Sequence, residues 1–181
     1  NEKDEVEWPP HPDRLFCALV QAWADLGQPE CGRCALLWLE RLHRQSPPLL
    51  CCGDTLSSNT LPRFVPVNDT WKPARKDGAL AAPIAGTFLG RDRKERRIPT
   101  ATLSDGSFDL WWPDAMPSDE QRAALGELAA AVASLGHSSS LVTVELLNEP
   151  APSGPTLAPA GDGEQMLRIP TPGRLEDLQK A

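Results

Sequence analysis

The chain has 181 residues, of which 40% are hydrophobic, enough for one folded core, and we expect no membrane-spanning run. It opens with residues 1–5, which are polar and mostly charged and form no apolar segment, so we expect no secretory signal. Its five cysteines, an odd number, favour reduced thiols in the cytoplasm over a disulfide framework. The net charge of −7 at first argues against nucleic acid as a partner.

A first helix is predicted from about Pro12 to Leu26. Proline is well tolerated at the first helical position, Asp13 suits the positive end of the helix dipole, and Gly27 supplies a stop. The proline-rich residues 8–12 predict a fixed entry angle, which would hold this helix against a sheet. Apolar positions recur at helical spacing and predict one buried stripe: Leu15, Phe16, Leu19, Val20, Trp23 and Leu26.

A second helix is predicted from about Arg33 to Arg44, and its buried side comprises Leu36, Leu39 and Leu42. Two consecutive prolines follow shortly afterwards and prevent the helix from continuing.

A short strand is predicted at about Arg63 to Val67, where prolines at 62 and 66 restrict it to the edge of a sheet. The stretch from Lys72 to Arg97 is predicted to be a long, mobile, basic excursion within an insertion of about residues 49–105, because its periodicity is weak and it contains several breakers.

Charge is concentrated in this basic excursion. It contains eight basic and three acidic residues, so its net charge is +5 and the rest of the chain carries a net charge of −12. A solvated surface loop is one interpretation. We favour RNA binding, because phosphate contacts need many cations on a deformable element and a polyanion responds to local potential. The basic residues are Lys72, Arg75, Lys76, Arg91, Arg93, Lys94, Arg96 and Arg97.

Two strands and a helix are predicted in the next part of the chain. Residues 107–112 alternate, with Phe108, Leu110 and Trp112 on one face, as in a strand. Ser118, with glutamine three residues later, predicts a capping box at the start of a third helix that ends at Gly136. The buried stripe of this helix comprises Leu125, Leu128, Ala129, Val132 and Leu135. Residues 139–147 alternate again and predict a final strand, with Val142, Val144 and Leu146 on one face.

This order of elements predicts an α+β fold. It matches a ferredoxin-like (RNA-recognition-like) βαββαβ unit over residues 1–147 if a first strand, missing from this chain, precedes Glu2. Residues 148–163 are rich in Pro, Gly and Ala and predict a linker. Residues 164–181 predict a short strand and the start of a helix, which would open a second ferredoxin-like domain whose remainder is absent.

Several stretches, taken in order, resemble one protein family. They are EVEWPPHPDRLFCALVQAW, RFVPVND, RRIPTATL leading to FDLWWP, LGHSSSLV and LRIPTPGRLEDL. Together they are similar to the N-terminal half of the CRISPR-associated protein of type I-G (formerly I-U) systems in which the fifth and sixth Cas families are fused. The resemblance is scattered over most of residues 2–178 and implies a repeat-associated fold built on ferredoxin-like units.

The resemblance implies a subunit of a CRISPR surveillance (Cascade-type) complex in antiviral defense. Its first half would bind the 5′ handle of the guide RNA and cap the complex, with other complex subunits as partners. The second half of the full-length protein would resemble the endoribonuclease that processes CRISPR repeat RNA without a metal. Because this chain stops near the start of that half, we expect it to be non-catalytic, without cofactor or membrane partner. The alternative is that the chain itself cleaves repeat RNA.

Two places outside the basic excursion are candidate RNA contacts. Arg14 lies in the first helical turn, where amide groups and a guanidinium can converge on phosphate. In the LGHSSS stretch, His137, Ser138 and Ser139 could donate to phosphate or ribose oxygens, although a capping glycine followed by a polar turn also explains it. His137 is also a weak candidate for general acid–base catalysis, since no partner base is visible.

The cysteines raise the question of zinc. Cys31 and Cys34 have the spacing of a zinc knuckle, but the adjacent Cys51 and Cys52 make a poor second pair. Core or idle thiols are the other interpretation, so no metal ligand is predicted. A zinc-stabilised interaction module without RNA affinity stays open as a third hypothesis.

Overall fold

The structure is a computed structural model in two compact units. Unit 1 comprises Asn1–Glu7 and Thr55–Thr102, and unit 2 comprises Trp8–Asp54 and Leu103–Ala181. The described residues are 8–52, 55–66, 75–76, 79–80, 93–104, 106–137, 140–148, 156–163 and 166–180, with the backbone alone between 55 and 99. Within these ranges the chain is an α+β protein with four helices and small antiparallel sheet elements, which is compatible with the predicted ferredoxin-like unit.

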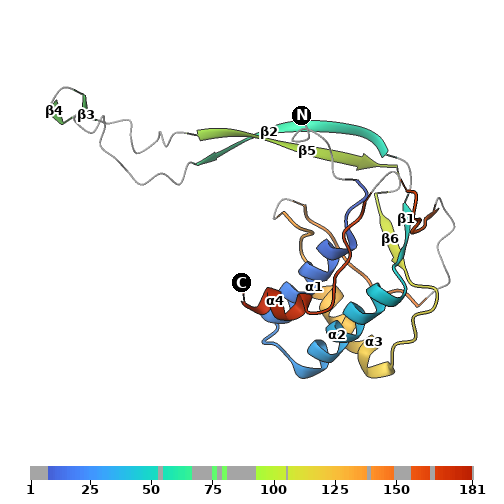
Figure 1. Cartoon of the computed structure of the whole chain (residues 1–181). Coiled ribbons are helices and arrows are strands. Elements are labelled where there is room, and N and C mark those ends of the chain that lie inside the picture. Colours follow the sequence, from blue (N-terminus) through green and yellow to red (C-terminus); the bar gives the residue numbers. More distant parts are fainter. Residues whose placement is uncertain are drawn as a thin grey trace. The chain divides into compact units, whose positions relative to one another are not determined.

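The helices of unit 2 are α1 (Pro12–Asp25), α2 (Glu30–Gln45), α3 (Asp119–Ala131) and α4 (Arg174–Lys180), shown in Figure 1. The first two confirm the predicted helices, although α2 begins earlier than expected, directly after Pro29. Of the described helices, none combines the length and the apolar character needed to cross a membrane.

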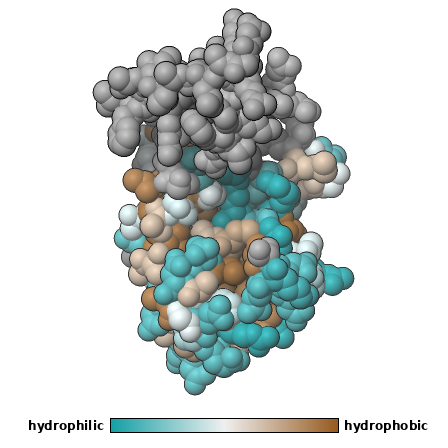
Figure 2. Space-filling view, turned by 90° about the vertical axis from the view of Figure 1, so that its left-hand side faces the viewer, coloured by the Kyte–Doolittle hydropathy of each residue, from teal (hydrophilic) through white to brown (hydrophobic). Residues whose placement is uncertain are grey.

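The core of unit 2 lies among these helices, because α1, α2 and α3 all contact one another and α4 contacts α1 and α2. Phe16, Leu36 and Leu175 are fully buried in it. The predicted stripe of α1 is confirmed in its middle, whereas Leu15 is only partly buried and Leu26 is 50% exposed. On the face seen in Figure 2, hydrophilic side chains of the described residues surround smaller apolar areas.

The start of α3 confirms the predicted capping box. The Gln121 backbone amide donates to Ser118 Oγ at 3.2 Å, and the Ser118 amide donates to Gln121 Oε1 at 2.9 Å. The helix ends at Ala131, before Gly136, yet Val132 and Leu135 remain buried as the stripe predicted.

A three-stranded antiparallel sheet in unit 2 has the order β6-β1-β7. The central strand β1 (Leu49–Cys52) pairs with β6 (Phe108–Trp111), which was predicted, and with β7 (Thr156–Leu157), which was not. Leu50, opposite Leu110 and Leu157, is buried in it. Trp8, in the proline-rich segment, meets Phe108 of β6 edge-on, with ring centroids 5.9 Å apart.

Unit 1 contains the strands β2 (Thr55–Pro66), β3 (Arg75–Lys76) and β4 (Ala79–Leu80), and most of β5 (Arg93–Leu103). The strands β2 and β5 form a two-stranded sheet, and β3 pairs antiparallel with β4. The prediction of an irregular excursion is therefore wrong for residues 93–97, which lie in β5. A ladder with β2, distant in sequence, supplies the backbone hydrogen bonds that a local pattern does not reveal.

The final strand predicted at residues 139–147 is wrong for the part that the structure describes. Leu141 forms a single bridge with Ser134, and residues 142–148 join no sheet. The alternation still has a structural cause, because Val142 and Val144 pack against the helical core. An alternating pattern reports which side chains are buried, whereas a strand also needs a partner for its backbone.

The C-terminal residues pack on the same core as the first helix. The strand predicted after residue 164 is not present at residues 166–170, but the predicted helix start is confirmed by α4. Glu40, on α2, is only 4% exposed, and its carboxylate accepts hydrogen bonds from the amides of Gly173 at 2.6 Å and Leu175 at 3.0 Å. The carboxylate thus caps α4. The linker and the second domain stay predictions.

His43, on α2, connects three parts of the core. It is 1% exposed, and its Nδ1 donates to the Leu39 carbonyl at 2.8 Å. The ring meets Phe16 of α1 and Trp112, which follows β6, edge-on. Burial lowers the pKa of His43, opposed by the Leu39 hydrogen bond and by the charge of Asp13. His43 is therefore held in the neutral form.

This burial predicts a pH-dependent stability. The pKa of His43 lies below the value of about 6.5 that it regains on unfolding, so the unfolded chain binds the proton more tightly. The free energy of unfolding should therefore fall as the pH drops from about 6.5 through the folded pKa. The total fall is about 1.4 kcal/mol for each pH unit by which the folded pKa of His43 lies below the unfolded one. Urea unfolding between about pH 5.5 and 7.5 measures this slope. H43F should flatten this slope, and an equal slope in H43F and the wild type would contradict its assignment to His43.

Candidate nucleic-acid interface

The first turn of α1 holds the C-terminal segment by its backbone. His11, the N-cap of α1, makes no side-chain cap; instead its Nδ1 accepts a hydrogen bond from the Arg168 amide at 3.0 Å. The Asp13 amide in turn donates to the Arg168 carbonyl at 3.0 Å. The exposed Arg168 is thereby anchored beside the positive end of a 14-residue helix.

Asp13 also binds the first residue of α4. The Arg174 guanidinium donates to both carboxylate oxygens, from Nε to Oδ1 and from Nη2 to Oδ2, each at 3.0 Å. This bidentate pair raises the pKa of Arg174. Arg174 Nη2 also lies 3.4 Å from the Cys17 sulfur. Burial raises the pKa of the Cys17 thiol, with a further contribution from Asp13, while Arg174 and Arg168 oppose it.

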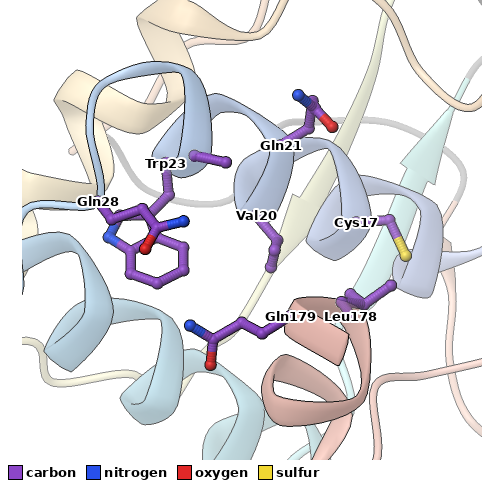
Figure 3. A pocket seen from close by; sticks show the side chains of 8 residues that line it. Cys17, Val20, Gln21, Trp23, Gln28, Leu178 and Gln179 are labelled. Atoms are coloured by element: carbon purple, nitrogen blue, oxygen red, sulfur yellow. The ribbon is translucent and has the colours of Figure 1, made fainter. Parts of the chain in front are cut away.

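A small cavity of about 210 Å³ lies between α1 and α4. Cys17 and Val20 of α1 face Leu178 and Gln179 of α4 across it, as Figure 3 shows. The cavity is lined by side chains of α1 and α4 and by Gln28 of the loop after α1, and none of the predicted RNA ligands lines it, so it is separate from the interface described next.

Arg14 lies against the turn that contains His137. A Cβ atom built on Gly136 would stand 2.6 Å from Arg14 Nη1 and 3.5 Å from its Cδ and Cζ, so the guanidinium occupies the space that a side chain would fill. Gly136 has a φ of +77°, which L side chains rarely adopt. The positive φ therefore favours glycine here, and the end of the flexible Arg14 side chain lies against it.

Hydrogen bonds within the chain shape this turn. The Leu135 amide donates to the Ser140 carbonyl at 2.9 Å, and the Ser140 amide donates to the His137 carbonyl at 2.8 Å. The exposed His137 projects from this closed turn, next to the glycine that Arg14 covers. Two predicted RNA ligands far apart in sequence, Arg14 and His137, thus belong to one local surface. Ser138 and Ser139 lie outside the described residues.

The structure places the predicted basic ligands in a different unit. Arg75 and Lys76 form β3, and residues 93, 94, 96 and 97 lie in β5. Lys72 and Arg91 are outside the described residues. These positions belong to unit 1, whereas Arg14 and His137 belong to unit 2. Of the predicted RNA ligands, the structure brings Arg14 and the His137 turn together.

Arg168 was missed by the sequence reasoning. The sequence assigned it to a separate domain, and no local pattern links it to the first helix. Its charge opposes the rise in the pKa of Cys17 that burial causes. We use the name α1 rim for three residues of unit 2: Arg14, which contacts the Gly136–His137 turn, His137 itself, and Arg168, whose backbone is hydrogen-bonded to the first turn of α1.

The cysteines are placed in distinct surroundings. Cys31 and Cys34 are exposed at the start of α2, and Cys51 is buried in β1 with its sulfur 3.6 Å from Thr156 Oγ1. In the described part of the chain, no three or more His, Cys, Asp or Glu side chains gather so that they could hold a metal ion.

Comparison with known protein families matches residues 1–181 to the family described as CRISPR-associated protein, GSU0054 family. No curated protein and no solved structure matches the chain significantly.

Proposed function

Because the chain belongs to the GSU0054 family of CRISPR-associated proteins, we propose that it is a guide-RNA-binding subunit of a type I CRISPR surveillance complex. The observation that carries this proposal is the meeting of Arg14 with the Gly136–His137 turn. The type I-G subtype, the fused architecture and the capping of the complex through the 5′ handle are the finer parts of the same proposal.

The chemistry of the α1 rim suits an RNA backbone. A guanidinium at the positive end of a helix can bind a phosphate through two parallel hydrogen bonds. An exposed imidazole beside it can donate to a second phosphate or ribose oxygen. Such contacts position the RNA without reading its bases, as a subunit that holds the constant handle of many guides requires.

The acidic remainder of the chain is compatible with this proposal. Acidic faces repel unrelated RNA and can dock the basic faces of neighbouring subunits. Guide RNA and other subunits of the effector complex are therefore the proposed partners, and the basic residues of unit 1 are a second proposed contact.

Replacing Arg14 tests the rim directly. R14A should weaken binding of a CRISPR repeat RNA about tenfold and reduce the slope of log affinity against log salt by about one. Fluorescence anisotropy at several salt concentrations measures both quantities. R41A is the matched control, because Arg41 is an exposed arginine on α2. If R14A and R41A bind alike, Arg14 is no RNA ligand.

The alternative function, cleavage of repeat RNA, has its own test. The purified chain should yield no product from repeat RNA in EDTA if it only binds the guide, as proposed. Product formation that H137A abolishes would replace the binding proposal with metal-independent endoribonuclease activity. Product that survives H137A would place the catalyst elsewhere.

A further inference from the structure

Two exposed cysteines lie one helical turn apart at the start of α2. In a regular helix, Cα atoms three residues apart are about 5 Å from each other, inside the range of roughly 4.4–6.8 Å found in disulfides. Their Cβ atoms would need to approach by about 1–2 Å. Cys31 lies among the first residues of α2, whose amide groups have no acceptor within the helix, so a small tightening at this end disturbs few backbone bonds.

The inner side of this turn is fixed to α1. Gly32, between the two cysteines, lies so close to Trp23 that a Cβ atom would be 2.7 Å from the indole Cδ1. The Trp23 indole N–H donates to the Pro29 carbonyl, at the N-cap of α2, at 2.9 Å. The first turn of α2 is therefore held against α1, while both thiols on its outer side are exposed. The Cys34 thiol donates to Glu30 Oε1 at 3.7 Å.

The other cysteines are less accessible. Cys51 is buried, and Cys17 and Cys52 are half-buried. A small-molecule oxidant in solution should therefore reach the pair on α2 first.

We propose that Cys31 and Cys34 are a reversible redox pair that closes a disulfide within α2 by exchange with a small-molecule disulfide such as oxidised glutathione. The thiolate of one cysteine attacks a glutathione sulfur, and a mixed disulfide forms as one glutathione thiolate leaves. The second cysteine thiolate attacks the protein sulfur, and the protein S–S bond forms as the second glutathione thiolate leaves. The protein loses two electrons to glutathione, and the two thiol protons pass to the departing glutathione thiolates.

The bond should be easily reversed. The required approach of the Cβ atoms is a departure from relaxed disulfide geometry, and strained disulfides are more readily reduced. Excess reduced glutathione should therefore restore both thiols.

The test equilibrates the full chain in buffers of oxidised and reduced glutathione, alkylates the remaining thiols and identifies peptides by mass spectrometry. The peptide with both cysteines should lose two alkylatable thiols together, become lighter by two hydrogen atoms and carry no glutathione. Both C31S and C34S should instead keep a stable glutathione adduct on the remaining thiol, while C17S and C52S should behave as wild type. Stable adducts in the wild type, or thiols at both positions that survive fully oxidised glutathione, would overturn the proposal.

Discussion

E40A should lower the free energy of unfolding by about 2–4 kcal/mol, because it removes the acceptor of two backbone hydrogen bonds in the core. The Glu40 carboxylate is buried and receives the amides of Gly173 and Leu175. Once it is removed, both amides lose their acceptor, and α4 is held to α2 by apolar packing without these two hydrogen bonds. Urea unfolding followed by tryptophan fluorescence measures the change.

Two further variants make this prediction specific. E40Q retains an acceptor oxygen and should cost less than E40A. E127A removes an exposed carboxylate from α3 and should change stability by less than about 0.5 kcal/mol. A loss in E40A no larger than that in E127A would show that α4 does not depend on this cap.

A chain with Arg93, Lys94, Arg96 and Arg97 all replaced by alanine should bind repeat RNA on the order of a hundredfold more weakly at moderate salt. These residues lie in β5, within the most basic stretch of the sequence. Each phosphate contact to a single strand contributes roughly 0.7 to the salt slope, so the slope should fall by up to about three. Anisotropy titrations at three or more salt concentrations measure affinity and slope together.

A charge-matched variant controls for the change in net charge. Alanine at Arg33, Arg41, Arg44 and Lys180 removes the same number of cations from α2 and α4, so its RNA affinity should stay within a few fold of wild type. If both quadruple variants lose affinity equally, total charge rather than β5 governs binding. If only R14A is impaired, the interface lies in unit 2 alone.

Local signals in the sequence were sufficient for the helices. Proline at the start of α1, the Ser118–Gln121 capping box and the spacing of apolar residues all act over a few positions, so they predicted α1, α2 and α3 and most of their buried sides. The strand β6 was predicted for the same reason, because its alternation is complete within residues 107–112.

Pairing of distant strands was not predictable in this way. The strand β1 follows a pair of prolines and has no alternation, yet it is the centre of the sheet because β6 and β7 supply its hydrogen bonds. The opposite error was made at residues 142–148, where alternating apolar residues predicted a strand. The described residues include no partner strand for this segment. A β-strand forms only when a second segment pairs with it, and the sequence of one strand does not show which segment that will be.

The candidate site shows the same division. The residue types of Arg14 and His137 marked them as possible RNA ligands from the sequence, since a helix start and a polar turn are local features. Their meeting across Gly136, the arrival of Arg168 at the first turn of α1 and the burial of Glu40 beneath α4 join segments far apart in the chain. Composition and local spacing determined which elements form and which groups carry charge. Folding alone decided which of those groups share a surface, because such contacts depend on packing between whole helices.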